Sequence, residues 1–457
     1  MKVLKFGGTS VGTVESLRHV KNIVENISGK SIVVVSALGG ITDKLILTAN
    51  KAAKGDFSYK DEITSMVERH ENIINQLVDK NSQSDVAKNI KGLFAELSKI
   101  LDGISLIGML PEQVLDVVVS FGERLSSVIV TAIIKGAVRH DSLEFIKTEK
   151  WHGKNIVDIA MTNDLINKEF SFDEGVAIVP GFISRDKKNG WITNLGRGGS
   201  DYTAALIAAA LDADLLEIWT DVDGFMTADP RIVKNAVVIP RLSFTESMEL
   251  CTFGAKVVYP PTIYPVFHKN IPIKILNTFN YTAPGTLITD TQDIPDYNIK
   301  GISPLRNTAL FTLKIKKERN DIASLSNRTL NALSKNGIRI FPVNNEHPDN
   351  EYSFSVSSND AEETFSILKE EFAPEISNGD LYEPLLKDSL SSLAVVGADM
   401  KKNNDLIIRI ENSLRREDIA IIAYSYGNSD TTISFMVEGD KTEKALQIVH
   451  NIVFDGI

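Results

Sequence analysis

Cysteine is nearly absent from this sequence of 457 residues, and its absence narrows the chemistry. Cys251 is the one cysteine in the chain. A single thiol can form neither an internal disulfide nor a thiolate cluster for a metal ion. The seven histidines lie at no metal-ligand spacing, so we expect no metal site made by side chains. A reducing compartment suits such a chain, and we expect the protein to be cytoplasmic.

Long apolar runs and an excess of basic residues are also missing. No stretch approaches the ~18 apolar residues that a membrane-spanning helix needs. The apolar run at the N-terminus is too short for a signal peptide. The formal net charge is −11, whereas nucleic-acid backbones are held by clustered Lys and Arg. We therefore expect neither a membrane nor a nucleic acid as a partner.

What the sequence does contain is a regular alternation of two patterns. A chain of this length exceeds one ordinary core, so two or three domains are expected. Up to about residue 276, short runs rich in Val and Ile alternate with amphipathic stretches. This order predicts an α/β fold with a mostly parallel open sheet and helices on both faces. Strands are expected at residues 3–6, 31–35, 176–179, 215–219 and 271–276.

The C-terminal part shows a different and repeated pattern. Residues 280–296 contain Pro284-Gly285 and Pro295 among Thr and Asp, which is typical of a linker. After it, a β-α-β-β-α order begins at Ala309 and starts again at Leu393. Two such units in tandem predict ferredoxin-like domains, a form that small-molecule sensing domains often take.

A glycine turn follows the first expected strand. Gly7 and Gly8 would let the backbone approach a ligand without a side chain in the way. Thr9 or Ser10 would cap the next helix, whose free N–H groups suit an anion. Lys5 could reach the same phosphates as a point charge. By itself this segment fits a plain structural turn better than a phosphate loop.

Established nucleotide-binding patterns do not match. Gly7 to Gly12 has the spacing of a Walker loop, but Thr13 and Val14 stand where Lys and Ser or Thr are required. No His-Arg-Asp or Asp-Phe-Gly set occurs, so a protein kinase is excluded. No Gly-x-Gly-x-x-Gly segment occurs either, because Asp201 stands where its last glycine belongs.

Other segments place polar residues beside glycines. Thr42 follows a second glycine turn, which fits a structural role equally well. Glu123 could hold an ammonium group, although adjacent Glu and Arg are more often solvated. Arg197 lies among glycines, and its fork suits a carboxylate or a phosphate. Asp201 is either a helix cap or an acid that faces the ligand.

The segment from Trp219 to Arg231 is rich in polar residues at the end of an expected strand. Its Asp-x-Asp-Gly run is no calcium loop, since the glycine falls at the fourth position instead of the sixth. Such a loop suits a nucleotide base and ribose. Lys256 is either a phosphate contact or an ordinary surface lysine.

These segments together resemble the aspartate kinases of the amino-acid-kinase superfamily. The resemblance covers nearly the whole chain, and the ordered set is far more specific than any one member. The matching segments are residues 5–10, 121–123, 195–201, 219–231 and 253–256.

The resemblance implies a domain order. The amino-acid kinase domain would occupy residues 1–285, followed by a linker at 286–302. Two ACT domains would follow at 303–388 and 389–457, with interleaving of the two left open. Because ACT sheets commonly pair across chains, a homodimer or larger homo-oligomer is expected, with an amino-acid effector at the ACT domains.

The resemblance also implies a reaction, the ATP-dependent phosphorylation of the side-chain carboxylate of L-aspartate. This is the first step of lysine, threonine and methionine biosynthesis. Lys5 would neutralise the transferring phosphoryl group, and Asp201 would orient Lys5 and the substrate. Thr42, Glu123 and Arg197 would contact the amino acid. The ATP site would be lined by Lys5, Gly7, Gly8, Thr9, Ser10, Thr220, Asp221, Met226, Arg231 and Lys256. Mg²⁺ would bridge the nucleotide phosphates.

Some positions depart from the family pattern. Asp43 stands where the family often has Asn, and Met226 where some members have an aromatic residue. The expected effector loops at 316–321 and 397–402 lack the usual glycines, and Tyr426 replaces a polar residue. Two other functions stay open: a kinase for glutamate, N-acetylglutamate, carbamate or UMP, and a silent amino-acid sensor with a kinase fold.

Overall fold

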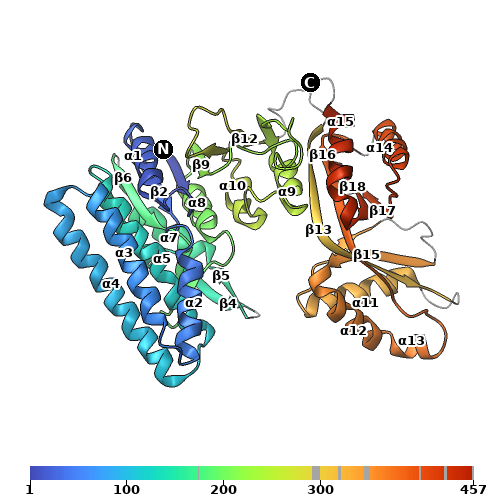
Figure 1. The fold of residues 1–457 in the computed structure, drawn as a ribbon, viewed down its shortest axis with the longest axis horizontal. Helices are drawn as coiled ribbons and strands as arrows, with labels where there is room; N and C mark the ends of the chain where they lie inside the picture. Colours follow the sequence, from blue (N-terminus) through green and yellow to red (C-terminus); the bar gives the residue numbers. More distant parts are fainter. Residues whose placement is uncertain are drawn as a thin grey trace. The chain divides into compact units, whose positions relative to one another are not determined.

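The computed structural model describes residues 1–151, 153–172, 174–290, 299–316, 321–343, 350–400, 403–426 and 430–454. They form two compact units, each discontinuous in sequence. The first unit comprises Met1–Phe225 and Val257–Gln292, and the second comprises Met226–Lys256 and Asp293–Ile457. Each unit is described by itself, and Figure 1 gives the labels of its elements.

A mostly parallel sheet forms the centre of the first unit. Its strands follow the order β12-β11-β9-β1-β2-β6-β3. Neighbours pair in parallel except β11 and β12. The bounds are β1 Lys2–Phe6, β2 Ser31–Val35, β3 Val138–Arg139, β6 Val176–Pro180, β9 Leu215–Thr220, β11 Ile273–Asn277 and β12 Thr286–Thr289. The expected parallel α/β sheet is confirmed.

Alternation along β1 places its side chains on opposite faces of this sheet. Leu4 and Phe6 belong to a large apolar core, whereas Lys5 faces α8 and forms an ion pair with Asp201. Helices cover both faces, because α8 packs against β1, β2 and β9 while α5 packs against β2 and β6. The first strand therefore carries one ion-paired lysine, Lys5, between two core residues.

Long helices build the rest of this core. Figure 1 shows α2 to α5 running side by side, and their neighbouring pairs are in contact. The helices of the first unit are α1 Val14–Glu25, α2 Ile41–Ala53, α3 Tyr59–Leu77, α4 Lys80–Ile107, α5 Glu112–Ile133, α6 Ser142–Phe145, α7 Ile159–Glu169, α8 Gly199–Ala210 and α10 Tyr264–Phe267, with a 3₁₀ turn η1 at Pro260–Ile263.

A smaller sheet also belongs to the first unit. Its order is β5-β4-β7-β8. The strands are β4 Lys147–Trp151, β5 Lys154–Val157, β7 Ile183–Asp186 and β8 Ile192–Asn194. The last of them leads directly into the glycine-rich segment before α8.

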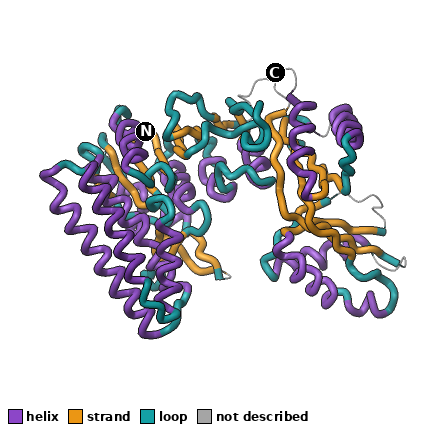
Figure 2. The backbone as a smooth tube through the Cα atoms, viewed as in Figure 1, coloured by secondary structure: helices purple, strands orange, loops and turns teal. Residues whose placement is uncertain are grey.

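An antiparallel sheet organises the second unit, in the order β14-β15-β13-β16-β18-β17. Figure 2 shows its strands in orange with helices beside them. The strands are β13 Ile299–Lys314, β14 Phe341–Pro342, β15 Glu351–Ser357, β16 Leu385–Gly397, β17 Ala423–Tyr426 and β18 Thr432–Glu438. A short strand β10 at Arg241–Ser243 also belongs to this unit but is not part of this sheet.

The two long strands β13 and β16 serve both ferredoxin-like repeats. The first half of β13 pairs with the second half of β16, which also pairs with β18. The second half of β13 pairs with β15 and with the start of β16. Asn307 and Ser389, both with positive φ, lie where the pairing shifts register. Each repeat thus obtains its fourth strand from the other repeat's stretch of chain.

Helices give each repeat its own core. One core gathers α14, α15 and β18, and the other gathers α11, α12 and β15. The helices of this unit are α9 Phe244–Thr252, α11 Ile322–Lys335, α12 Ala361–Glu371, α13 Ala373–Ser377, α14 Asn404–Arg416 and α15 Thr442–Phe454, with 3₁₀ turns η3 Ser358–Asp360 and η5 Gly439–Lys441. The expected pair of ferredoxin-like ACT folds is confirmed.

The segment expected to be a linker is partly regular. Residues 286–302 include all of β12 and the start of β13, whereas residues 291–298 lie outside the described residues. Proline and threonine suggested irregular structure there, but Thr286 and Ile288 alternate into the buried side of an antiparallel pair. Among the described helices, none has the length and apolar character required to cross a bilayer.

Candidate active site

Loops at the carboxyl ends of the central strands form the candidate site. Because β1 lies between β2 and β9 in a parallel sheet, the loops that follow these strands meet at one edge. Backbone hydrogen bonds join them: the Gly7 N–H donates to the Trp219 carbonyl at 3.2 Å, and the Ser36 N–H to the Phe6 carbonyl at 3.2 Å. The sequence-predicted segments after each strand are therefore neighbours.

Gly8 and Gly39 bring two of these loops into backbone contact. The Gly39 N–H donates to the Gly8 carbonyl at 2.9 Å. A Cβ atom on Gly39 would lie 3.0 Å from that carbonyl oxygen, and one on Gly8 would lie 3.2 Å from the Ala37 carbonyl oxygen. These distances are shorter than most real Cβ contacts, so a side chain at either position would require the facing loop to shift by a few tenths of an ångström.

Lys5 and Asp201 form the charged centre of the site. The Lys5 Nζ lies 2.6 Å from the Asp201 Oδ1, and both side chains are 12% exposed. Asp201 lies in the first turn of α8, whose N-terminus favours negative charge. Gly198 occupies the N-cap of α8, so Asp201 is not the helix cap, and its side chain lines the cavity described below.

Glu123 is a buried carboxyl group in the middle of α5. Its Oε1 accepts a hydrogen bond from the Ala37 N–H at 3.0 Å. Its Oε2 is buried and has no hydrogen-bond partner among the described residues. Burial raises the pKa of Glu123 to about 8, and the charge of Lys5 and the Ala37 bond only partly oppose this. The charge of Lys5 is therefore too weak at Glu123 to outweigh the cost of burying the ionised carboxylate.

A cavity of about 340 Å³ joins these groups. Glu123 and the Lys5–Asp201 pair line it together with Thr42 and Gly8. The remaining lining residues are Ser36, Ala37, Leu38, Gly39, Gly40, Asp43, Phe182, Gly196, Gly198, Gly199 and Ser200. The cavity thus brings together residues from four segments that were singled out in the sequence.

Arg197 differs from these residues, because it is exposed and does not line the cavity. Its guanidinium carbon lies 5.7 Å from the centre of the Tyr259 ring. Gly196 and Gly198, its neighbours in sequence, do line the cavity and both have positive φ. Arg197 is therefore held beside the cavity by a glycine-flanked backbone and an aromatic ring.

The expected capping role of Thr9 or Ser10 is wrong. The first helix begins later, at Val14, and Thr13 caps it by accepting a hydrogen bond from the Ser16 N–H. The polar pair Thr13 and Ser16 forms a capping box, which outcompetes the earlier hydroxyls. Ser10 is fully buried and hydrogen-bonded to Thr278 at 2.7 Å. Gly7 contacts Trp219 through its backbone, and Thr9 is exposed.

The residues predicted to line the ATP site fall in both units. Thr220 and Asp221 lie in the first unit at the end of β9, where the Thr220 hydroxyl donates to Asp221 at 3.1 Å. Met226, Arg231 and Lys256 belong to the second unit. Arg231 there forms a 2.7 Å ion pair with Asp229, and Lys256 is exposed.

Some residues of the site gave no signal in the sequence. Phe182 lines the cavity with φ at 66°, an unfavourable value for a bulky residue. Asp116, two turns before Glu123 on α5, accepts a hydrogen bond from Asn194, whose own side chain accepts one from the Gly196 N–H at 3.1 Å. Burial and the charge of Glu112 raise the pKa of Asp116 to about 6. These residues support the loop that carries Arg197.

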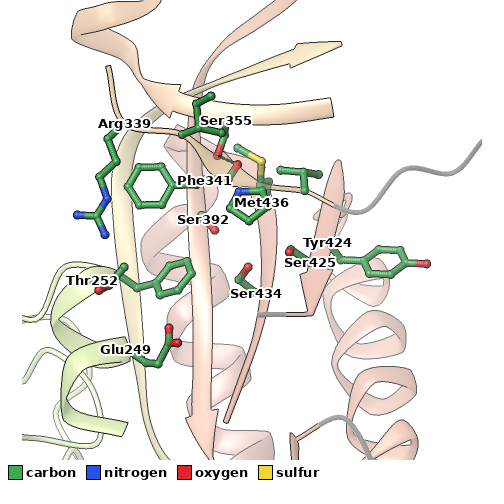
Figure 3. Close-up of a pocket in the computed structure, with 14 residues that line it drawn as sticks. Glu249, Thr252, Arg339, Phe341, Ser355, Ser392, Tyr424, Ser425, Ser434 and Met436 are labelled. Atoms are coloured by element: carbon green, nitrogen blue, oxygen red, sulfur yellow. Dashed lines mark hydrogen bonds between the residues drawn. The ribbon is translucent and has the colours of Figure 1, made fainter. Parts of the chain in front are cut away.

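A second cavity, of about 300 Å³, lies within the second unit. Figure 3 shows Glu249 and Thr252 approaching from α9, with Ser392 and Ser434 on the strands. Ser355 and Ser425 also line it, and the Ser355 hydroxyl donates to the Phe341 carbonyl at 3.5 Å. The expected effector loops are only partly described, because residues 317–320 and 401–402 and the Tyr426 side chain lie outside the described residues.

Fold and site together define a class: an α/β enzyme domain with a Lys–Asp pair among glycine loops, followed by paired ACT folds. The sequence profile of the amino acid kinase family matches residues 1–277, and an ACT domain profile matches residues 393–452. The chain belongs to the amino acid kinase family.

Named relatives agree with this class. A bifunctional aspartokinase/homoserine dehydrogenase of Buchnera aphidicola is 34% identical over 99% of this chain and 56% of its own length. The chain thus spans little more than half the length of that curated relative. Escherichia coli aspartokinase III, solved with aspartate and ADP, is 27% identical with a TM-score of 0.83 over 99% of this chain and 100% of its own. The same enzyme with lysine and aspartate gives 26% and 0.76, over 99% of each chain.

Proposed function

We propose that this protein is an aspartate kinase, which transfers the γ-phosphoryl group of ATP to the side-chain carboxylate of L-aspartate. The observation that carries this proposal is the cavity in which Lys5, Asp201 and Glu123 meet among glycine loops. The likeness over nearly full length to a kinase solved with aspartate and ADP supports it.

Lys5 and Asp201 would act on the phosphoryl group. Phosphoryl transfer needs positioning and neutralisation of charge more than covalent help from the protein. The Lys5 ammonium supplies positive charge, and the 2.6 Å contact with Asp201 fixes its position. The attacking carboxylate is already ionised at neutral pH, so the step requires no general base. The bond that forms joins a carboxylate oxygen to phosphorus, and ADP leaves.

Glu123, Thr42 and Arg197 would select the amino acid. Glu123 presents an unpartnered buried oxygen among the described residues, which suits the substrate ammonium. An ammonium there would favour the ionised form of Glu123, whose pKa is otherwise raised to about 8. Thr42 lines the same cavity, and Arg197 beside it would bind a substrate carboxylate through its fork.

The nucleotide would lie over the loops after β1 and β9. Gly7, Gly8, Thr9, Ser10, Thr220 and Asp221 lie at this edge of the sheet. Met226, Arg231 and Lys256 stay proposed ATP contacts on the strength of the family resemblance alone. Mg²⁺ would be held by the nucleotide phosphates, as is usual for this ion.

The proposal is tested by incubating the protein with ATP, Mg²⁺, L-aspartate and hydroxylamine. Aspartyl hydroxamate should form, and the Lys5→Ala variant should form almost none. A panel with glutamate, N-acetylglutamate, carbamate and UMP tests the related kinases. Turnover of one of those alone would replace aspartate as the substrate, and binding of ligands without any turnover would favour a silent sensor.

We also propose that the ACT folds bind an amino-acid effector and that chains associate into a homodimer or larger assembly. The second cavity supports the first part, because hydroxyl groups line it together with Glu249 and Arg339. A thermal-shift screen with lysine, threonine and methionine would detect a ligand, since binding to the native state raises its melting temperature. Light scattering would give the mass of the assembly. We further infer a cytoplasmic location from the lone Cys251.

A further inference from the structure

Arg69, a residue outside every motif of the sequence, connects the two glycine loops of the site. It lies on α3 and is half-buried. Its Nη1 donates to the Gly39 carbonyl at 2.9 Å, and its Nη2 donates to the Gly12 carbonyl at 2.7 Å. One planar guanidinium therefore binds one carbonyl oxygen from each loop.

The two carbonyls belong to loops that already touch. Gly12 ends the turn that follows Lys5, and Gly39 lies in the loop that leads into α2 and Thr42. A Cβ atom on Gly12 would lie 3.0 Å from the Gly8 carbonyl oxygen and 3.4 Å from the Gly39 nitrogen. A small displacement of either loop would therefore move the other.

The direction of the Gly39 carbonyl also sets the direction of an N–H group. A trans peptide unit is planar, so the Gly40 N–H points opposite the Gly39 carbonyl, away from Arg69. Gly40 has φ at 80°, caps the N-terminus of α2 and lines the cavity. By binding the carbonyl, Arg69 holds this peptide in the orientation that turns its N–H away from α3.

Arginine is suited to this task in a way that lysine is not. Its fork places two donors at a fixed separation in one plane, whereas a lysine ammonium is a single point donor. Burial lowers the pKa of Arg69, but a guanidinium keeps its charge in proteins. Its positive charge therefore lies on one side of the two loops. The phosphates and the substrate carboxylates would bind on the other side.

We propose that Arg69 is a positioning residue that fixes the phosphate-side loop and the amino-acid-side loop relative to each other. The proposal rests on the proposed kinase function for the identity of the two ligands. It assigns Arg69 no contact with either substrate. Replacing Arg69 would free the loop after Lys5 and the start of α2 at the same time. We therefore expect the replacement to weaken the use of both ATP and aspartate.

The test compares Arg69→Ala and Arg69→Lys with a matched control, Arg124→Ala. Arg124 is an arginine on α5, one of the long helices that run beside α3. Its guanidinium pairs with Glu96 at 3.0 Å and stacks on Phe121 instead of binding loop carbonyls. Expected for Arg69→Ala is a fall of roughly 10- to 100-fold in kcat/KM for both ATP and aspartate, as misplaced reacting groups produce. Arg69→Lys should be intermediate, and Arg124→Ala should stay within about twofold.

A purely structural role would give a different result. In that case Arg69→Ala would melt at a lower temperature but, assayed well below that temperature, would keep the kcat/KM values of the wild type for both substrates, and the proposal would be wrong. If Arg69→Ala does not fold, Arg69→Lys decides by the same comparison: unchanged kcat/KM values for both substrates overturn the proposal.

The failure of the proposed function can be told apart from this outcome. If the wild-type protein phosphorylates no acceptor, the readout becomes the rise in melting temperature caused by ATP with Mg²⁺. A rise in wild type and Arg124→Ala that shrinks in Arg69→Ala supports the positioning role without kinase activity. An equal rise in all three proteins contradicts it.

Discussion

The cavity beside Lys5 and the cavity in the second unit differ in the groups that line them. In the first unit, glycine loops and a few buried charges are fixed by short contacts, such as the 2.6 Å Lys5–Asp201 pair. In the second unit, small hydroxyl side chains from several strands line a space of similar size. The first arrangement allows little adjustment, because backbones touch. The second is lined by side chains instead of touching loop backbones, so we expect it to tolerate substitutions better.

The largest expected effect concerns Lys5. Lys5→Ala should lower kcat/KM by at least roughly 10²- to 10³-fold, the usual loss when a charge that stabilises a transition state is removed. Hydroxamate formation measures this loss at a temperature well below the melting temperature of the variant, because Lys5→Ala leaves the mostly buried Asp201 carboxylate unpaired and should also lower stability. Asp201→Asn serves as a companion, since it keeps the shape but removes the charge that positions Lys5. Near-normal turnover in Lys5→Ala would mean that the cavity beside Lys5 is not where phosphoryl transfer takes place.

A pH dependence should follow from Glu123, because its pKa is raised to about 8 from a reference value of 4.5. Between these values the folded state binds more protons than the unfolded state, so the free energy of unfolding falls as pH rises. Aspartate binding requires the ionised form, so its affinity should rise by up to about tenfold per pH unit below 8 and then level off.

The Glu123 prediction is checked by two titrations. The ligand-free melting temperature of wild type should drop between pH 5.5 and 8 more than that of Glu123→Gln, which cannot ionise. The KM for aspartate of wild type should decrease over the same range. Parallel melting curves of the two proteins, or a KM independent of pH, would show that Glu123 is not the buried acid described here.

Close packing around α5 predicts an effect of intermediate size on the free energy of unfolding. A Cβ atom on Gly122 would lie 2.7 Å from the Ala37 Cβ, so Gly122→Ala should cost about 1–3 kcal/mol of stability through overpacking. On α4, Gly103 has nothing within 4 Å of such an atom. Gly103→Ala should therefore stabilise the protein by about 0.5–1 kcal/mol. Urea unfolding measures both, and equal effects of the same sign would argue against a rigid first site.

The smallest effects are expected in the second cavity. Ser434→Val and Ser392→Val introduce β-branched residues that suit strands, so stability should change by about 1 kcal/mol or less. Kinase turnover without effector should stay within about twofold, while a thermal shift caused by an amino acid should disappear. A loss of turnover comparable to that of Lys5→Ala would mean that the two cavities are not separate in function.

The sequence predicted the first site better than the second for a physical reason. Lys5, Glu123 and Asp201 stand beside glycines that packing requires, and such glycines are visible in a sequence. Serines such as Ser392 and Ser434 alternate with core residues as in any strand, and nothing marks the face that a cavity will use. Arg69 and Asp116 gave no signal, because helical arginines and aspartates are common and their partners lie far away in the chain.

The sequence left open those features of the fold that depend on pairing between distant segments. The strand β12 lies in a stretch rich in Thr and Pro, and only its pairing with β11 makes it regular. The sharing of β13 and β16 between repeats depends on pairing across about 80 residues of chain. The domain limits 1–285, 286–302, 303–388 and 389–457 therefore stay a proposal.

Residues 226–256 belong to the second unit, although in the sequence they lie between the two parts of the first unit. This affects any attempt to express the first unit alone. The Thr227 carbonyl accepts a hydrogen bond from the Ile302 N–H at 2.7 Å, and the Thr227 hydroxyl bonds to His450 at 3.0 Å. A truncated chain that ends at residue 285 keeps this segment but loses both partners, and it exposes apolar residues such as Ala228 and Val233. No single cut of the chain separates the two units, so we expect a chain that ends at residue 285 to be less stable than the whole chain.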